Sequence, residues 1–297
     1  MPQVLLSGSD PKATGISIAL IVLDLLVVAA LLGCSAFLVM RRQKGADWKI
    51  LPIWAIMTAI WAWAWSYIWY VVQSITERLN APYGEIGINL IYALLCLLFG
   101  HAAICFLFCT FYRLVHILLR ASNEGAKLPV KINVVHWTIL ALIVVLSIAD
   151  FALWVVEDFS FLVLDGDYRP VQVTRSALIW LASWEITAWA AFLAIKTKRT
   201  SSFKGPSIAL LSGSIAYSAM TFMWLVDYLR WYQTVVTYTF TEEINSLAAK
   251  SFLEVFFCLG LYGGIMVFCA LSHQLEKKDD AGIVLQQTLA QEDTARP

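Results

Sequence analysis

Long apolar stretches alternate with short polar stretches along the whole chain. Seven apolar stretches have about the 20 residues that an α-helix needs to cross a hydrocarbon core of about 30 Å. They cover residues 14–40, 50–75, 86–112, 134–156, 176–195, 207–231 and 246–272. Because a strand edge in lipid would leave backbone groups unpaired, all seven are predicted to be α-helices. The pattern therefore predicts an all-α, polytopic membrane protein that forms a seven-transmembrane-helix bundle.

The composition excludes a soluble chain and a nucleic-acid-binding chain. Of the 297 residues, 60% are hydrophobic and 14% are charged, whereas about a quarter of the residues of a soluble domain are charged. The 21 basic and 21 acidic residues cancel, so no excess of positive charge is present to hold a nucleic acid. We expect a multi-pass protein of the endoplasmic reticulum or plasma membrane, with the lipid bilayer as a partner and no nucleic acid.

The charges of the connections predict the orientation in the membrane. Basic residues follow the first, third and fifth stretches: Arg41, Arg42, Lys44, Lys49, Arg113, Arg120, Lys127, Lys131, Lys196, Lys198, Arg199 and Lys204. Acidic residues follow the second, fourth and sixth: Glu77, Glu85, Glu157, Asp158, Asp165, Asp167, Glu242 and Glu243. Because cytosolic connections collect Lys and Arg, the N-terminus is predicted outside or lumenal and the C-terminus cytosolic. The basic inner loops are also where a cytosolic partner would bind.

No internal repeat divides the chain, so residues 1–272 are predicted to form one transmembrane domain. Residues 273–297 are polar and of mixed charge, which is typical of a cytosolic tail that forms no packed core.

The cysteines and histidines argue against a cofactor. All six cysteines fall inside predicted helices and are expected to be free thiols that pack as small apolar groups. His116, His136 and His273 lie near the predicted cytosolic ends, so no two histidines are expected at a matching mid-membrane depth to hold a haem between helices. No cofactor and no metal site are predicted.

Ionisable residues inside the membrane are costly, so they are candidates for function. They are Asp24, Asp150, Glu185, Asp227, Lys250 and Glu254. Counted along the predicted helices, all five acids fall in the outer half, which predicts a polar site that opens outward. Lys250 and Glu254 are four residues apart and are expected to pair with each other. Glu185, Asp227 and Asp24 are therefore the candidate catalytic proton donors, and Glu185 and Asp24 have no cationic partner nearby in the sequence.

Tryptophans accompany these acids at helical spacing. A carboxylate beside an aromatic face attracts a positive centre, although tryptophans also gather at membrane interfaces. We therefore expect a cavity that binds an apolar or amphiphilic small molecule. Its lining residues are predicted to be Asp150, Trp184, Trp189, Trp224, Lys250 and Glu254. A stripe of Trp54, Trp61, Trp65 and Trp69 in the second helix either packs in the core or forms another wall.

Two known kinds of seven-helix protein fit poorly. Arg113, at the inner end of the third helix, follows no acidic residue, and the last helix has no Asn-Pro-x-x-Tyr run, unlike G-protein-coupled receptors. Lys250 lies too near the outer end for a retinal Schiff base, and the third helix has no acid to serve as its counter-ion.

The pair Trp184-Glu185 resembles the Trp-Glu pair of small fungal membrane-bound terpene cyclases, and Asp227 would be a second acid. That resemblance, which covers only these residues, implies a cofactor-free enzyme of isoprenoid or secondary metabolism that works by general acid catalysis. The leading hypothesis is such a membrane-bound cyclase or isomerase. A receptor-like sensor of a small ligand is the alternative, and a proton-linked transporter and a scaffold rank below both.

Overall fold

The computed structural model describes residues 11–43, 51–79, 86–122, 130–160, 169–199, 201–233 and 240–272. The helices are α1 (Pro11–Gln43), α2 (Ile53–Leu79), α3 (Ile86–Ser122), α4 (Val130–Ser160), α5 (Arg169–Lys196), the 3₁₀ turn η1 (Thr197–Arg199), α6 (Ser201–Gln233) and α7 (Phe240–Leu271). Within these ranges, seven helices are long and apolar enough to cross a membrane. The predicted all-helical, seven-helix architecture is confirmed, and the chain is an integral multi-pass membrane protein. The predicted tail, 273–297, lies outside the described residues.

All seven helices are longer than the apolar pattern predicts, and the extensions of α3 and α5 contain arginines. α3 continues to Ser122, ten residues beyond its predicted end, and α5 begins at Arg169, seven residues before its predicted start. The extra turns contain Arg113 and Arg120, which are exposed, and Arg175, which is buried against polar partners. A charged residue with access to solvent or to a partner does not have to end a membrane helix.

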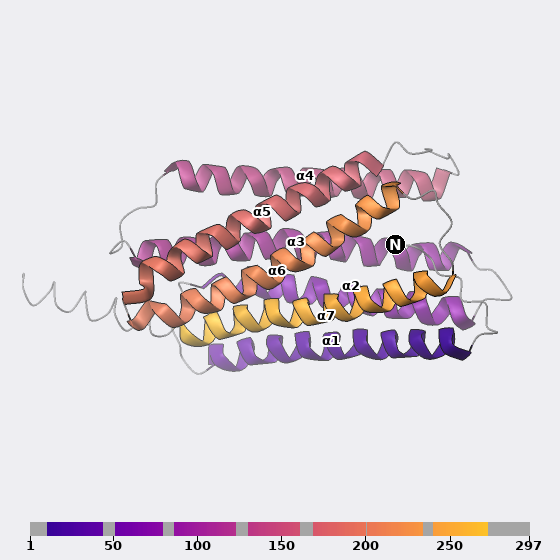
Figure 1. The fold of residues 1–297 in the computed structure, drawn as a ribbon, viewed down its shortest axis with the longest axis horizontal. Coiled ribbons are helices and arrows are strands. Elements are labelled where there is room, and N and C mark those ends of the chain that lie inside the picture. Colours follow the sequence, from indigo (N-terminus) through magenta and orange to yellow (C-terminus); the bar gives the residue numbers. More distant parts are fainter. Residues whose placement is uncertain are drawn as a thin grey trace, which may run out of the picture.

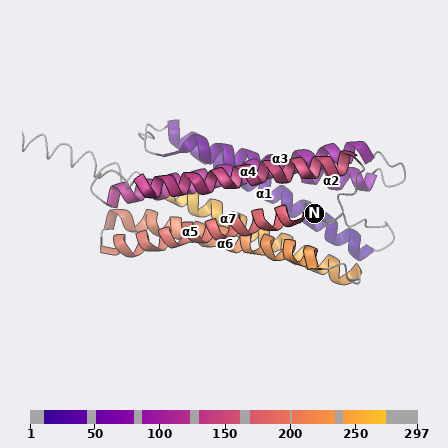
Figure 2. The ribbon, with the colours of Figure 1, turned by 90° about the horizontal axis from the view of Figure 1, so that it is seen from above.

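Consecutive helices run antiparallel, with α4 along one edge of the bundle and α1 along the opposite edge (Figure 1). We call one end of the bundle, at the left of Figure 1, the basic end, because Arg41, Arg120 and Lys196 lie in the last turns of α1, α3 and α5. Turning the molecule by 90° separates α3 and α4 from α5 and α6 (Figure 2). α4 contacts both α3 and α5.

The apolar core lies where α2, α3, α6 and α7 meet. Its largest fully buried side chains are Tyr112, Tyr217, Tyr262, Phe108, Phe111 and Phe268. The lipid-facing surfaces carry exposed apolar side chains, such as Leu26, Val145 and Phe256. Lipid tails are as apolar as these side chains, so close packing and polar contacts, rather than apolar burial alone, must hold the helices together.

The tryptophan stripe of α2 does not form an interior wall. Trp54, Trp61 and Trp65 are 57%, 43% and 40% exposed, whereas Trp63, two residues from the stripe, is buried. Trp65 and Trp69 stack on each other with ring centroids 6.1 Å apart. The stripe therefore lies on the lipid-facing side of α2.

Two glycines allow α6 and α7 to approach closely. A Cβ added at Gly264 would lie 2.7 Å from the Cα of Gly213 and 2.8 Å from the carbonyl oxygen of Ala209, closer than a real Cβ atom comes to backbone. A Cβ added at the neighbouring Gly263 would meet nothing within 4 Å. The contact is a small-residue helix crossing of the kind common in membranes.

We expect Gly264→Ala to force α6 and α7 apart and to lower the free energy of unfolding by about 1–3 kcal/mol. Gly263→Ala is the matched control and should leave stability unchanged, because its methyl group enters open space. Thermal unfolding in detergent measures both variants. Equal stability of the two would show that the close approach does not occur.

Candidate functional site

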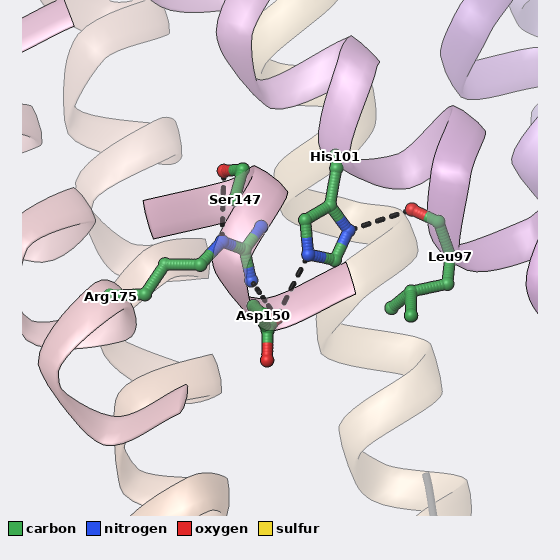
Figure 3. Close-up of polar contacts among 5 residues, drawn as sticks. All are labelled: Leu97, His101, Ser147, Asp150 and Arg175. Carbon is green, nitrogen blue, oxygen red and sulfur yellow. Dashed lines mark hydrogen bonds and ion pairs between the residues drawn. The ribbon is translucent and has the colours of Figure 1, made fainter. Parts of the chain in front are cut away.

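A buried network joins α3, α4 and α5 (Figure 3). It lies in the half of the bundle away from the basic end, because Asp150 is twenty residues from the start of α4 and ten from its end. Asp150 of α4, only 2% exposed, is its centre. Its Oδ2 atom lies 2.8 Å from Nε2 of His101 on α3 and accepts a hydrogen bond of 3.2 Å from Nη1 of Arg175 on α5. Nε of Arg175 also donates to Oγ of Ser147 at 3.0 Å. One carboxylate oxygen thus holds three helices together.

The two contacts of His101 can both be hydrogen bonds only if the network holds an extra proton. Nδ1 of His101 lies 2.7 Å from the carbonyl oxygen of Leu97, and a carbonyl only accepts, so Nδ1 carries a hydrogen. A neutral imidazole then has a lone pair on Nε2, which would face an ionised Asp150 at 2.8 Å. Both contacts are hydrogen bonds at once only if His101 is an imidazolium or Asp150 is protonated. In either form, and with Arg175 charged, the network carries one net positive charge.

α4 attaches to the bundle through a seam of both polar and apolar side chains. Between residues 130 and 156 of α4, the buried side chains are His136, Leu140, Ile143, Ser147 and Asp150. Their alternating spacing of four and three residues forms one seam along the helix. Polar residues occupy both ends of the seam and two apolar residues its middle. Because apolar side chains gain little by leaving lipid, the polar contacts are important for holding α4 in place.

The basic half contains a second network at the other end of this seam. Nε2 of His116 on α3 lies 2.8 Å from Nδ1 of His136 on α4, and Nε2 of His136 lies 2.8 Å from Oε1 of Glu185 on α5. Nε1 of Trp189 donates to the same Oε1 atom at 2.6 Å. The ring of Tyr112 stacks on His136 with centroids 4.3 Å apart, which fixes the plane of the imidazole.

In this second network the hydrogen bonds can all point the same way, from His116 through His136 to Glu185. With Glu185 ionised, Nε2–H of His136 donates to the carboxylate, and Nδ1 of His136 accepts from Nε2–H of His116. A proton added to Nδ1 of His116 can therefore move two steps: His116 gives its Nε2 proton to His136, which gives its own to Glu185. The arrangement suits proton transfer between the basic end and the membrane interior.

Comparisons with protein families, with curated proteins and with solved structures give no match. The resemblance to terpene cyclases therefore depends on Trp184, Glu185 and Asp227 alone. The structure gives these residues separate surroundings: Trp184 is 54% exposed on the lipid side, Glu185 binds His136, and Asp227 pairs with Lys250. Trp184 accordingly does not line a cavity between helices, although it was expected to do so.

A third polar group joins α1, α2, α6 and α7. Lys250 forms its ion pair with Asp227 on α6, not with Glu254 one turn along its own helix as expected. Tyr67 donates to Oε1 of Glu254 at 3.5 Å. Asp24, 5% exposed, lies within electrostatic range of Glu254 and has no ion pair or hydrogen bond to another described residue.

Trp224, another expected cavity residue, stacks on buried Trp63 with ring centroids 5.6 Å apart, and it lies beside Glu254. The expected cavity residues therefore fall into separate groups: Trp224, Lys250 and Glu254 in this third group, Asp150 in the first network and Trp189 in the second.

Two further expectations from the sequence are wrong. Glu185 does not lie in the outer half of its helix: it is fifteen residues from Pro170 but eleven from Lys196, because the span starts earlier than predicted. Glu185 also has a basic neighbour, His136. His116 and His136 do share a depth, but their ring nitrogens touch, which leaves no room between them for a haem.

Sequence reasoning also missed the roles of His101, His116, His136 and Arg175. For the histidines, their distances from the connection between α3 and α4 could have indicated their partners. His116 lies six residues before the end of α3, and His136 six residues after the start of α4. His101 and Asp150 lie 21 and 20 residues from the same two helix ends. In an antiparallel helix pair with a short connection, residues equally far from the connection meet.

A shallow apolar cleft of about 200 Å³ lies between α3 and α4, beside the first network. It is lined by Leu98, His101, Ala102, Cys105, Val144, Ser147, Ile148 and Phe151. Leu98 and Ile148 are exposed on the surface of the bundle, so the cleft opens toward lipid. All six cysteines are free thiols, as predicted, and the described residues include no group of three or more His, Cys, Asp or Glu side chains that could hold a metal ion.

We expect a double-mutant cycle on Asp150 and Arg175 to show strong coupling. Asp150→Ala should lower the free energy of unfolding by about 3–5 kcal/mol, because it leaves the buried Arg175 charge without its carboxylate. Adding Arg175→Ala should recover part of this loss. Equilibrium unfolding in mixed micelles measures the cycle, and effects that add within about 0.5 kcal/mol would contradict the ion pair.

Proposed function

We propose that this protein carries protons across the membrane and binds one of them at His101 and Asp150. The supporting observation is the geometry of His101, whose contacts with Leu97 and Asp150 can both be hydrogen bonds only when a proton is held between the imidazole and the carboxyl. Chains of Asp, Glu and His inside a membrane typically mark proton pathways. This proton is buried, because His101 is 7% and Asp150 2% exposed.

The second network supports the same function from the other half of the bundle. The chain from His116 through His136 to Glu185 leads from the basic half toward the middle of the membrane. Loss of the proton from the first network must break one of the contacts of His101, and one of these joins α3 to α4. Proton release is therefore linked to the attachment of α4, which is how a proton gradient could move a helix.

We expect the purified protein in liposomes to carry protons when a membrane potential is imposed, and Asp150→Asn to abolish this flux. The amide keeps the shape of the side chain but cannot share a proton with His101. An internal pH dye measures the initial rate. Arg41→Gln is the control: it removes a charged contact between α1 and α7, the 2.8 Å bond from Arg41 to the Cys269 carbonyl, and should conduct like wild type.

Two results would contradict the proposal. One is a wild-type rate no greater than that of empty liposomes. The other is an Asp150→Asn rate equal to that of the wild type, with both variants folded as judged by thermal unfolding.

The cleft favours a second candidate, a membrane enzyme that protonates an apolar or amphiphilic molecule such as an isoprenoid lipid. His101 is one of the residues that line the cleft, and the lipid-facing mouth of the cleft would admit a substrate from the bilayer. Its volume of about 200 Å³ is below the roughly 300–1,000 Å³ of ordinary ligand pockets, so it would hold only one end of such a molecule.

We expect that, if the enzyme function holds, Ile148→Trp will fill the cleft and remove a product from lipid extracts of expressing cells. Because Ile148 belongs to neither network, this variant should keep its proton flux. An unchanged lipid profile in wild type, Ile148→Trp and host cells without the protein would exclude the enzyme candidate.

A further inference from the structure

The surface of α3 at the basic end carries two arginines without an acidic partner. Arg113 and Arg120 are exposed, and neither forms an ion pair with another described residue. Seven residues, or about 10.5 Å of helix rise, separate them, so they lie on the same face of α3. Both lie within electrostatic range of the buried His116. An anion bound between the two arginines would offset this concentration of positive charge.

The length of α3 places these arginines at the depth of lipid phosphates. The helix has 37 residues and is therefore about 55 Å long, whereas the hydrocarbon core of a bilayer is about 30 Å thick. A helix of this length, centred in the bilayer, extends about 13 Å beyond the core at each end. Arg113, nine residues or about 13.5 Å before Ser122, then lies at the edge of the core, and Arg120 lies among the headgroups.

Trp137 of α4 holds Arg113 in place. The guanidinium carbon of Arg113 lies 5.5 Å from the centroid of the Trp137 ring, and Nε1 of Trp137 donates to Oδ1 of Asn133 at 3.1 Å. A guanidinium group held over an indole face keeps its N–H donors free for a phosphate. The arginine is thus positioned before an anion binds.

The lipid-facing cleft between α3 and α4 lies on the same face of α4 as Trp137. Three cleft residues of α4 follow Trp137 by seven, eleven and fourteen residues: Val144, Ile148 and Phe151. These spacings are close to whole helical turns, and they place the cleft about 10 to 21 Å from Trp137 along the helix. One leaflet of the hydrocarbon core is about 15 Å thick. An acyl chain whose phosphate lies at Arg113 would therefore reach the cleft.

We propose that this surface of α3 and α4 binds an anionic phospholipid, with its phosphate between Arg113 and Arg120 and one acyl chain in the cleft. The inference does not depend on the proposed proton transport. The charges favour an anionic lipid, because a zwitterionic headgroup would bring a positive charge of its own to the two arginines. A cleft of about 200 Å³ suits the end of one chain.

We expect phosphatidylglycerol with palmitoyl and oleoyl chains to bind the purified protein in detergent, and Arg113→Gln or Arg120→Gln to weaken binding about fivefold each. Native mass spectrometry over a lipid titration measures the lipid-bound fraction. Arg41→Gln is the matched control and should bind like the wild type. Arg41 also lies at the basic end, but its guanidinium group already donates to the Cys269 carbonyl at 2.8 Å.

A second pair of variants tests the cleft. Ile148→Trp fills the cleft and should weaken binding of the long-chain lipid severalfold, while binding of dihexanoyl phosphatidylglycerol, whose chains are too short to reach the cleft, stays unchanged. Val145→Trp is the control for the added bulk. Val145 is 61% exposed on the lipid-facing surface and does not line the cleft, so this variant should bind both lipids like the wild type.

Several results would overturn the proposal. One is an unchanged affinity for phosphatidylglycerol in Arg113→Gln and Arg120→Gln, and another is equal binding of phosphatidylcholine by the wild type. Equal affinity for the dihexanoyl and long-chain lipids would show that the arginines hold a soluble phosphate compound and that the cleft holds no chain. A lipid-free dimer that Trp137→Ala dissociates would show that a second copy of the chain covers this face. Proton flux in liposomes tests the proposed function separately from all of these results.

Discussion

The contact between His101 and Asp150 holds α4 against α3 in the lipid bilayer, where apolar helices gain little free energy by associating. Arg175 extends the contact to α5 through the same carboxylate oxygen. An ionised side chain inside a membrane needs partners, and the partners of Asp150 come from two other helices, α3 and α5. The position of α4 and the charge state of the network therefore depend on each other, because each is stabilised by the same contacts.

The helices of the core and the edge helix α4 are held in place by different means. α6 and α7 approach through glycines until their backbones touch, and the aromatic core fills the space between α2, α3, α6 and α7. α4 instead meets its neighbours through a seam that is apolar only in the middle. The proposed proton-linked function would act on α4, because α4 is the helix whose seam ends in polar contacts.

The sequence predicted the fold well because the requirement for about 20 apolar residues per crossing is strong and local. Its errors at the ends of α3 and α5 came from arginines that were taken as boundaries. The site was harder, because it depends on which faces of different helices meet. Composition and spacing identified Asp150 and Glu185 as costly residues, but their partners His101, Arg175 and His136 lie on other helices.

Those partners could have been found in part by counting from the connection between α3 and α4. The count brings His101 to Asp150 and His116 to His136. It does not give the rotation of each helix about its axis, which decides that Trp184 faces lipid while Glu185 faces His136. Neither does it give the pairing of Lys250 with Asp227, which depends on the packing of α6 on α7.

The most direct test of this account is nitrogen-15 and carbon-13 solid-state NMR of His101 and Asp150 in lipid bilayers. The account predicts that Nδ1 of His101 carries a hydrogen and that a second proton lies between Nε2 and the Asp150 carboxyl. An Nδ1 atom without hydrogen, or a neutral His101 beside an ionised Asp150, would contradict it.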